Sequence, residues 1–122
     1  MRVSGDFEGA VGYTLLRYIP GRMNVRVPIV SFSDAATEAF FNHGKICKGL
    51  AWASLARIVR RKLDMIHYAA RLADLKSPPG NRLEALSGDL KGWHSIRANE
   101  QWRILFVWSK EGVKEVRVDD YH

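Results

Sequence analysis

The sequence predicts an α+β domain in which two N-terminal helices pack on a small, mainly antiparallel sheet. Residues 52–73 carry apolar side chains at helical spacing, whereas residues 93–119 alternate between apolar and polar. The run Ser77-Pro78-Pro79-Gly80 between them cannot continue a helix. A chain of 122 residues that is 47% hydrophobic, with four Trp, suits one compact domain.

The first patterned segment predicts a short strand followed by a helix. Residues 27–32 are rich in β-branched Val and Ile, which favour strands. Ser33 or Asp34 is expected to cap the helix, with Glu38 as the capping-box carboxylate. Gly44 is expected to end it, because glycine tolerates the left-handed C-cap conformation.

The second helix is the clearest predicted element. Its apolar stripe consists of Trp52, Leu55, Ala56, Val59, Leu63, Ile66, Ala70 and Ala73. The opposite face is basic, and we expect it either to contact RNA phosphates or to be an ordinary solvated surface. That face consists of Arg57, Arg60, Arg61 and Lys62, with His67 expected on its polar border.

The C-terminal half predicts an antiparallel meander. A short strand is expected around residues 83–86, followed by strands at 93–98, 101–108 and 113–119. Asn99-Glu100 would join two of them in a tight hairpin, because Asn tolerates positive φ. Residues 101–108 carry apolar side chains on both faces, which indicates a central strand. One face holds Trp102, Ile104, Phe106 and Trp108, and the other holds Arg103, Leu105 and Val107.

The charge balance indicates a polyanionic partner. Nineteen Lys and Arg face thirteen Asp and Glu, for a formal net charge of +6. Nucleic acid is the simplest such partner, although the charge could also serve only solubility. The single cysteine, Cys47, allows no intramolecular disulfide and no cysteine metal site, which favours a reducing, cytoplasmic location.

Residues 1–24 have no periodic pattern and are interpreted as an N-terminal extension that is non-native or dispensable, or else as a native arm that packs elsewhere. Asp6 and Glu8 stand where a secretory signal would be positive, and the apolar run at 10–16 is too short to span a membrane. The domain itself is expected at 25–122.

Five short motifs, in order and at matching spacing, closely resemble the HigB-like toxins of the RelE/ParE superfamily. They lie at 79–86 (PGNRLEAL), 88–92 (GDLKG), 95–97 (SIR), 99–104 (NEQWRI) and 120–122 (DYH). The resemblance extends over about residues 29–122 and implies the RelE/ParE-like toxin fold.

The resemblance also implies a function: the toxin of a type II toxin–antitoxin system, cleaving messenger RNA on the ribosome. In that reaction the 2′-hydroxyl attacks the adjacent phosphorus and the 5′-oxygen leaves, without metal or other cofactor. The implied partners are a HigA-like helix-turn-helix antitoxin, the ribosome and mRNA, with operator DNA reached only through the antitoxin. No membrane association is expected.

The catalytic residues implied by the motifs are Arg103, Asp120, Tyr121 and His122. The planar, charged fork of Arg103 suits a phosphate, although an ion pair with a carboxylate such as Asp119 is the structural alternative. Histidine is the side chain whose unperturbed pKa lies nearest neutrality, so His122 could exchange protons. Tyr121 could donate a hydrogen bond or stack on a base, and Asp120 would orient them. A fraying terminus is the alternative for the last residues.

RNA-binding residues are expected around the predicted hairpin, namely Lys91, His94, Arg97 and Asn99. Lys91 could instead be a solvated loop residue, and His94 an exposed strand residue. Some relatives carry His at the position of Glu84 and Lys at that of Ser87, where those side chains have been assigned to catalysis.

Other site chemistries find no support in the pattern. The sequence has no HExxH motif or spaced Cys/His set for a metal and no nucleotide-binding glycine loop, and Ser95 reads as a strand residue rather than a nucleophile. Two alternatives within the superfamily remain: a non-catalytic inhibitor of DNA gyrase, and a degenerate toxin that acts only as its antitoxin's partner in operon regulation.

Overall fold

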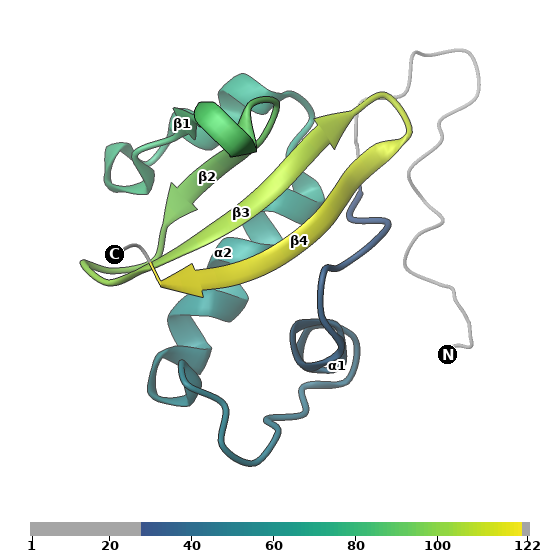
Figure 1. The fold of residues 1–122 in the computed structure, drawn as a ribbon, viewed down its shortest axis with the longest axis vertical. Coiled ribbons are helices and arrows are strands. Elements are labelled where there is room, and N and C mark those ends of the chain that lie inside the picture. The colour runs from purple at the N-terminus through teal and green to yellow at the C-terminus, as the bar shows by residue number, and fades with distance from the viewer. Residues whose placement is uncertain (1–27, 121–122) are drawn as a thin grey trace.

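The computed structural model describes residues 28–120, which form helices beside a four-stranded antiparallel sheet in the order β1-β2-β3-β4. Figure 1 looks onto the sheet face that is turned away from α2. The helices are α1 Ala35–His43 and α2 Ala56–Tyr68, and the strands are β1 Glu84–Ala85, β2 His94–Arg97, β3 Trp102–Ser109 and β4 Gly112–Asp120. Short 3₁₀ turns occur at η2 Ala53–Leu55, η3 Leu72–Lys76, η4 Pro79–Asn81 and η5 Gly88–Leu90. The predicted α+β class is confirmed.

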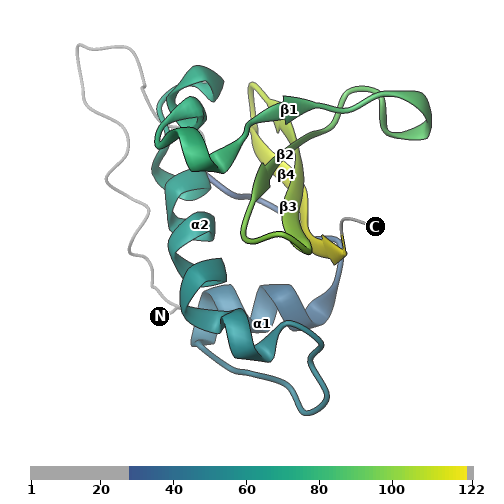
Figure 2. The same cartoon turned by 90° about the vertical axis from the view of Figure 1, so that its left-hand side faces the viewer.

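The hydrophobic core lies between α2 and one face of the sheet, two layers that Figure 2 shows edge-on. Val59, Leu63 and Ile66 of α2 are fully buried. They belong to one cluster with Ile104 and Phe106 of β3, whose side chains have no exposed surface. Helix α1 crosses below this layer near β4 (Figure 2). The prediction that 101–108 forms a central strand is confirmed, and Arg103 therefore lies on the face away from α2.

The predicted strand at 27–32 exists only as a bridged edge segment. Residue 27 is outside the described part, and Ile29 and Phe32 form isolated parallel bridges with β4. The Val30 amide donates to the Val113 carbonyl at 2.8 Å, and the Ile29 amide donates to His67 Nδ1 at 3.1 Å. His67 is thus buried against this segment and does not lie on a polar border, contrary to the prediction.

The start of α1 differs from the predicted capping box. Asp34 is the N-cap, and its Oδ1 accepts from the Thr37 amide at 2.7 Å. Thr37 therefore occupies the third helical position, and Glu38 stands one residue too late for the expected role. Gly44 caps the other end with φ 71°, as predicted.

The second helix is shorter than predicted, because it ends at Tyr68 rather than near residue 73. Ala69 is extended, and the Asp74 carboxylate accepts from the amides of Ala70 and Arg71 at 3.0 and 3.1 Å. These bonds give the backbone an alternative to the helix and begin the η3 turn instead.

The predicted extension 1–24 lies outside the described residues. Within 28–120, none of the helices has the length and apolar character needed to cross a bilayer.

Candidate functional site

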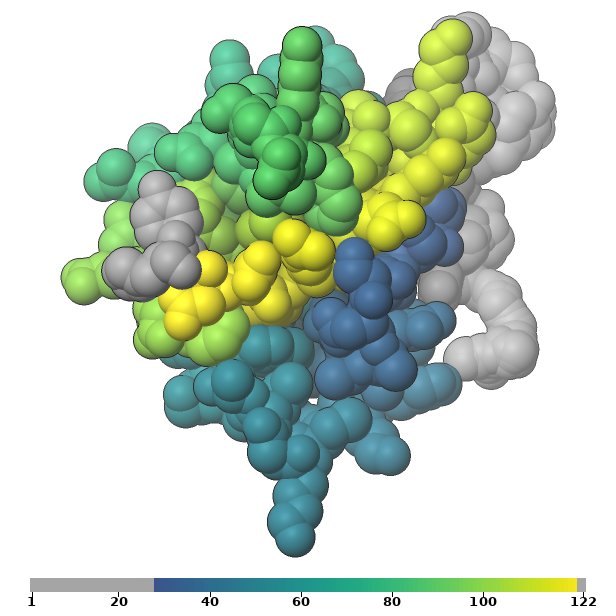
Figure 3. All heavy atoms as spheres, in the orientation of Figure 1, coloured from purple at the N-terminus to yellow at the C-terminus, as the bar shows by residue number. Residues whose placement is uncertain are grey.

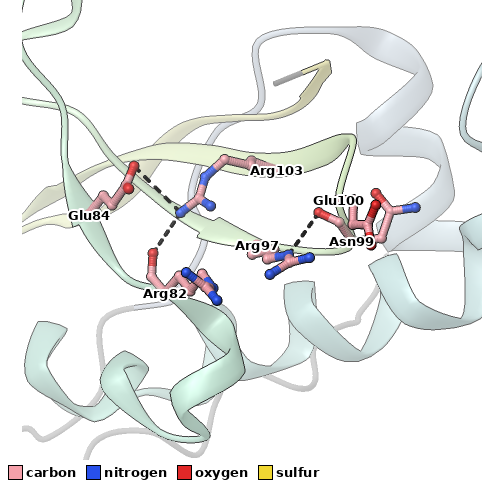
Figure 4. Close-up of a pocket in the computed structure, with 6 residues that line it drawn as sticks. All are labelled: Arg82, Glu84, Arg97, Asn99, Glu100 and Arg103. Atoms are coloured by element: carbon pink, nitrogen blue, oxygen red, sulfur yellow. Dashed lines mark hydrogen bonds and ion pairs between the residues drawn. The ribbon is translucent and has the colours of Figure 1, made fainter. Parts of the chain in front are cut away.

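Three arginines converge on a pocket beside β1, β2, β3 and the β2–β3 hairpin (Figure 4). Its volume is about 300 Å³, and its lining consists of Arg82, Glu84, Arg97, Asn99, Glu100 and Arg103. Three guanidinium groups against two carboxylates leave the lining with an excess of positive charge. Because Arg side chains offer planar sets of N–H donors, the pocket suits a phosphate group.

Arg103 is buried, with 4% of its surface exposed, and is held from two sides. Its Nε donates to Ser95 Oγ at 2.8 Å, and its Nη2 donates to the Arg82 carbonyl at 2.6 Å and the Ser95 carbonyl at 3.3 Å. Glu84 Oε1 lies 3.8 Å from Nη2. The expected alternative partner, Asp119, pairs instead with Arg117 at 3.4 Å. The guanidinium is therefore preorganised within the pocket.

Arg97 and Asn99 reach the pocket through the β2–β3 hairpin, where the predicted two-residue turn is wrong. β2 and β3 separate after the Arg97–Arg103 pair, and Asn99 does not adopt positive φ. Its Oδ1 instead accepts from the amides of Gln101 and Trp102 at 2.8 and 2.7 Å. Arg97 Nε donates to the Asn99 carbonyl at 3.1 Å, which fixes the arginine against the turn.

Arg82 and Glu100 were not among the predicted site residues. Arg82 follows the η4 turn and has a left-handed φ of 46°, so its carbonyl faces Arg103 while its side chain lines the pocket. Arg82 lies within the GNRLE motif, which was the available signal. Glu84, noted as a departure from relatives with His there, contributes a half-exposed carboxylate, and exposed Ser87 lies outside the lining set.

The C-terminal candidates are only partly described, because Tyr121 and His122 lie outside the described residues. Asp120 pairs in register with Trp102, and its Oδ2 accepts from Gln101 Nε2 at 3.0 Å. The described chain thus ends beside the hairpin that carries Asn99 and Glu100 (Figure 1).

Lys91 and His94 are not among the residues lining the pocket. Lys91 is exposed in the loop around η5, which stands over the open sheet face in Figure 3. His94 lies on the α2 side of the sheet, where its ring stacks on Phe106 with centroids 6.2 Å apart. Burial lowers the pKa of His94. The structure therefore does not bring these two residues together with Arg97 and Arg103.

Helix α2, which carries the other predicted basic residues, covers the sheet face opposite to that of Arg103 (Figure 2). Arg57, Arg60 and Arg61 are exposed, and Arg60 pairs with Asp64 at 3.3 Å. Lys62 was expected on this face, but it is buried, and its Nζ donates to Asn81 Oδ1 at 2.6 Å. Burial first, and the charge of Arg61 second, lower the pKa of Lys62.

Among residues 28–120, no group of three or more His, Cys, Asp or Glu side chains is placed to hold a metal ion. The chemistry visible in the described pocket is that of guanidinium, carboxylate and amide groups.

Comparisons with solved structures return matches at low identity. The chain is 19% identical to a chain of the YoeB-YefM complex from Staphylococcus aureus, covering 80% of this chain and 98% of that one with a TM-score of 0.46. It is 18% identical to the YoeB/ParE toxin from Agrobacterium tumefaciens, covering 78% and 99%, also with a TM-score of 0.46.

Comparisons of sequence identify the family. Toxin HigB-1 of Vibrio cholerae serotype O1 is 42% identical over 79 residues, which is 65% of this chain and 82% of the relative. An uncharacterized protein of Haemophilus influenzae is 31% identical over 90 residues, 74% of this chain and 88% of the relative. The family model described as the RelE-like toxin of type II toxin-antitoxin system HigB matches residues 30–122. This chain therefore belongs to the HigB-like family of RelE-like toxins of type II toxin–antitoxin systems.

Proposed function

We propose that the protein is a metal-independent endoribonuclease that cleaves messenger RNA on the ribosome and thereby inhibits translation. Membership of the toxin family supports this function. The observation that carries it is the preorganised Arg103 in a pocket with Arg82 and Arg97.

The arginines would act on the phosphate that is attacked by the neighbouring 2′-hydroxyl. Negative charge develops on the phosphorane oxygens, and fixed cationic donors stabilise it without having to reorganise. Arg103 is immobilised by Ser95 and the Arg82 carbonyl, so it needs little reordering. Glu84 is 3.8 Å from Arg103 and half-exposed, so a weak ion pair would yield to a phosphate.

Proton transfer is assigned to the C-terminal residues, as the sequence motif implies. His122 would exchange protons with the attacking or leaving oxygen, and Tyr121 would donate a hydrogen bond or stack on a base. Asp120, which accepts from Gln101 at the hairpin, would orient them.

The proposed partners follow from the same function. As a type II toxin, the protein has an antitoxin partner, and we propose the HigA-like helix-turn-helix kind, through which alone it would reach operator DNA. The ribosome and mRNA are the proposed substrates. The exposed Lys91 and the α2 arginines would contact ribosomal RNA phosphates, and binding would then weaken with salt.

Induction in cells, followed by mapping of transcript 5′ ends, tests this function. Wild type is expected to arrest growth and to produce new 5′ ends within translated frames. Arg103→Ala should abolish both effects, because losing a preorganised donor costs about 10²–10³ in rate. Arg103→Lys should recover little, because an ammonium cannot reproduce the fork.

Arg71→Ala is the matched control, because this arginine is exposed just before η3 and makes a surface ion pair with Asp74 at 3.5 Å. It should remain fully toxic, and every variant should still co-purify with the antitoxin. Growth arrest without new 5′ ends, together with loss of DNA supercoiling by gyrase, would contradict the ribonuclease function and support inhibition of gyrase instead.

A further inference from the structure

A buried ammonium group links α2 to the turn that precedes the pocket. Lys62 lies in the apolar layer of α2 with 9% of its surface exposed, and its Nζ donates to Asn81 Oδ1 at 2.6 Å. Burying a cation is costly, and an apolar side chain of similar volume is often as good for stability. Packing of α2 on the sheet therefore does not by itself account for this lysine.

Asn81, the partner of Lys62, is also hydrogen-bonded to the backbone around it. The residue is fully buried, and its Nδ2 donates to the carbonyls of Leu75 and Ser77 at 3.1 and 3.3 Å. Its own amide donates to the Pro78 carbonyl at 2.9 Å. The Asn81 side chain thus cross-links the backbone between η3 and η4, and its bond to Lys62 links this segment to α2.

Arg82, the next residue along the chain, connects this turn to the pocket. Arg82 adopts φ 46°, an uncommon conformation for a residue with a side chain, and its amide donates to the Pro79 carbonyl. In this conformation its carbonyl accepts from Arg103 Nη2 at 2.6 Å. A short path of hydrogen bonds and one peptide unit therefore connects Lys62 to the guanidinium of Arg103.

We propose that Lys62 and Asn81 are positioning residues for the ribonuclease site, holding the Arg82 carbonyl where it fixes the guanidinium of Arg103. This inference rests on the proposed function. In this arrangement Ser95 holds the Nε end of the guanidinium from the sheet, and the Arg82 carbonyl holds the Nη2 end from the turn. Neither Lys62 nor Asn81 touches RNA.

The first test compares cleavage by fully ribosome-bound protein at a temperature well below unfolding. Lys62→Met and Asn81→Leu should each slow the cleavage step about 10- to 100-fold, because small misplacement of a reacting group has effects of this size. The affinity for the programmed ribosome should be unchanged. Ile66→Val, a fully buried change on the same helix, is the matched control: it lowers the melting temperature but should leave cleavage at the wild-type rate.

Non-additivity distinguishes positioning from a general weakening of the fold. If the pair acts through Arg103, adding Lys62→Met to Arg103→Lys should slow cleavage no further. Multiplied effects in the double variant, or a wild-type cleavage step in Lys62→Met and Asn81→Leu, would overturn the proposal.

Nuclear magnetic resonance of the arginine side chains provides a readout that needs no activity. A fixed guanidinium shows separate signals for its two Nη groups, whereas rotation about the Cζ–Nη bonds averages them. Separate Arg103 signals are expected in wild type and Ile66→Val, and averaged ones in Lys62→Met. Unchanged Arg103 signals in folded Lys62→Met and Asn81→Leu would reject the positioning role, whether or not the wild type cleaves RNA.

Discussion

A buried arginine is stable only where its charge and its N–H groups find partners, and Arg103 finds them in Ser95 and the Arg82 carbonyl. Both of these partners are neutral acceptors. The half-exposed carboxylate of Glu84 forms an ion pair with Nη2 at 3.8 Å. These contacts fix the guanidinium in one orientation, as a preorganised phosphate donor requires.

His94 gives a prediction of acid sensitivity at the residue scale. Burial against Phe106 lowers its pKa from the ordinary 6.5, and Nδ1 is enclosed without a hydrogen-bond partner among the described residues. Between the folded pKa and 6.5 the unfolded chain binds a proton that the folded chain does not. The free energy of unfolding should therefore fall as the pH drops below about 6.5.

The measurement is urea unfolding of wild type and His94→Phe at pH 7.5 and 5.5. His94→Phe keeps an aromatic ring beside Phe106 but cannot titrate, so it should lose less stability on acidification. His43, His67 and His122 remain in both proteins and cancel in the comparison. Equal acid losses would mean that His94 does not carry this linkage.

At the scale of elements, the edge segment 28–33 depends on a close approach to β4. A Cβ added at Gly112 would lie 2.5 Å from Val30 Cγ1 and 2.9 Å from the Pro28 carbonyl oxygen, and φ is +144°. Gly112→Ala should therefore destabilise the fold by about 1–3 kcal/mol. Gly80→Ala, where a Cβ meets nothing within 4 Å, should cost far less in the same urea titration. Similar losses at both positions would contradict this account of the edge.

Periodicity predicted the elements well, because side-chain spacing on α2 and β3 is a local property of the sequence. It could not predict where side-chain oxygens compete for the backbone. Asp74 ends α2 early, and the Asn99 side chain builds the hairpin turn that positive φ was expected to build. The predictions that Lys62 and His67 lie on the polar side of the helix were wrong for a related reason. Both side chains are buried because each has a hydrogen-bond partner far away in the sequence, which spacing cannot reveal.

The candidate site was predictable only as far as its motifs allowed. Arg97, Asn99 and Arg103 come together in the pocket, as the hairpin pattern implied. Arg82 joins them through a long-range contact to Arg103, which no spacing along the chain reveals.

At the scale of the whole molecule, positive charge is divided between two sides of the sheet. Arg97 and Arg103 of the pocket lie on the sheet face away from α2, while exposed Arg57, Arg60 and Arg61 lie on α2 itself. A formal charge of +6 would draw the protein toward RNA generally, whereas the pocket holds the buried Arg103 guanidinium in one geometry. Binding and cleavage should therefore depend on different arginines.

The central claim is that the pocket around Arg103 stabilises attack by a 2′-hydroxyl on messenger RNA. The most direct measurement uses purified ribosomes programmed with a short messenger, and with a copy lacking the 2′-hydroxyl at the cleaved position. Wild type should cut the first, leaving a 2′,3′-cyclic phosphate, and spare the second, and Arg103→Ala should cut the first about 10²–10³-fold more slowly. Cleavage of the 2′-deoxy messenger, or wild-type cleavage by Arg103→Ala, would contradict the account.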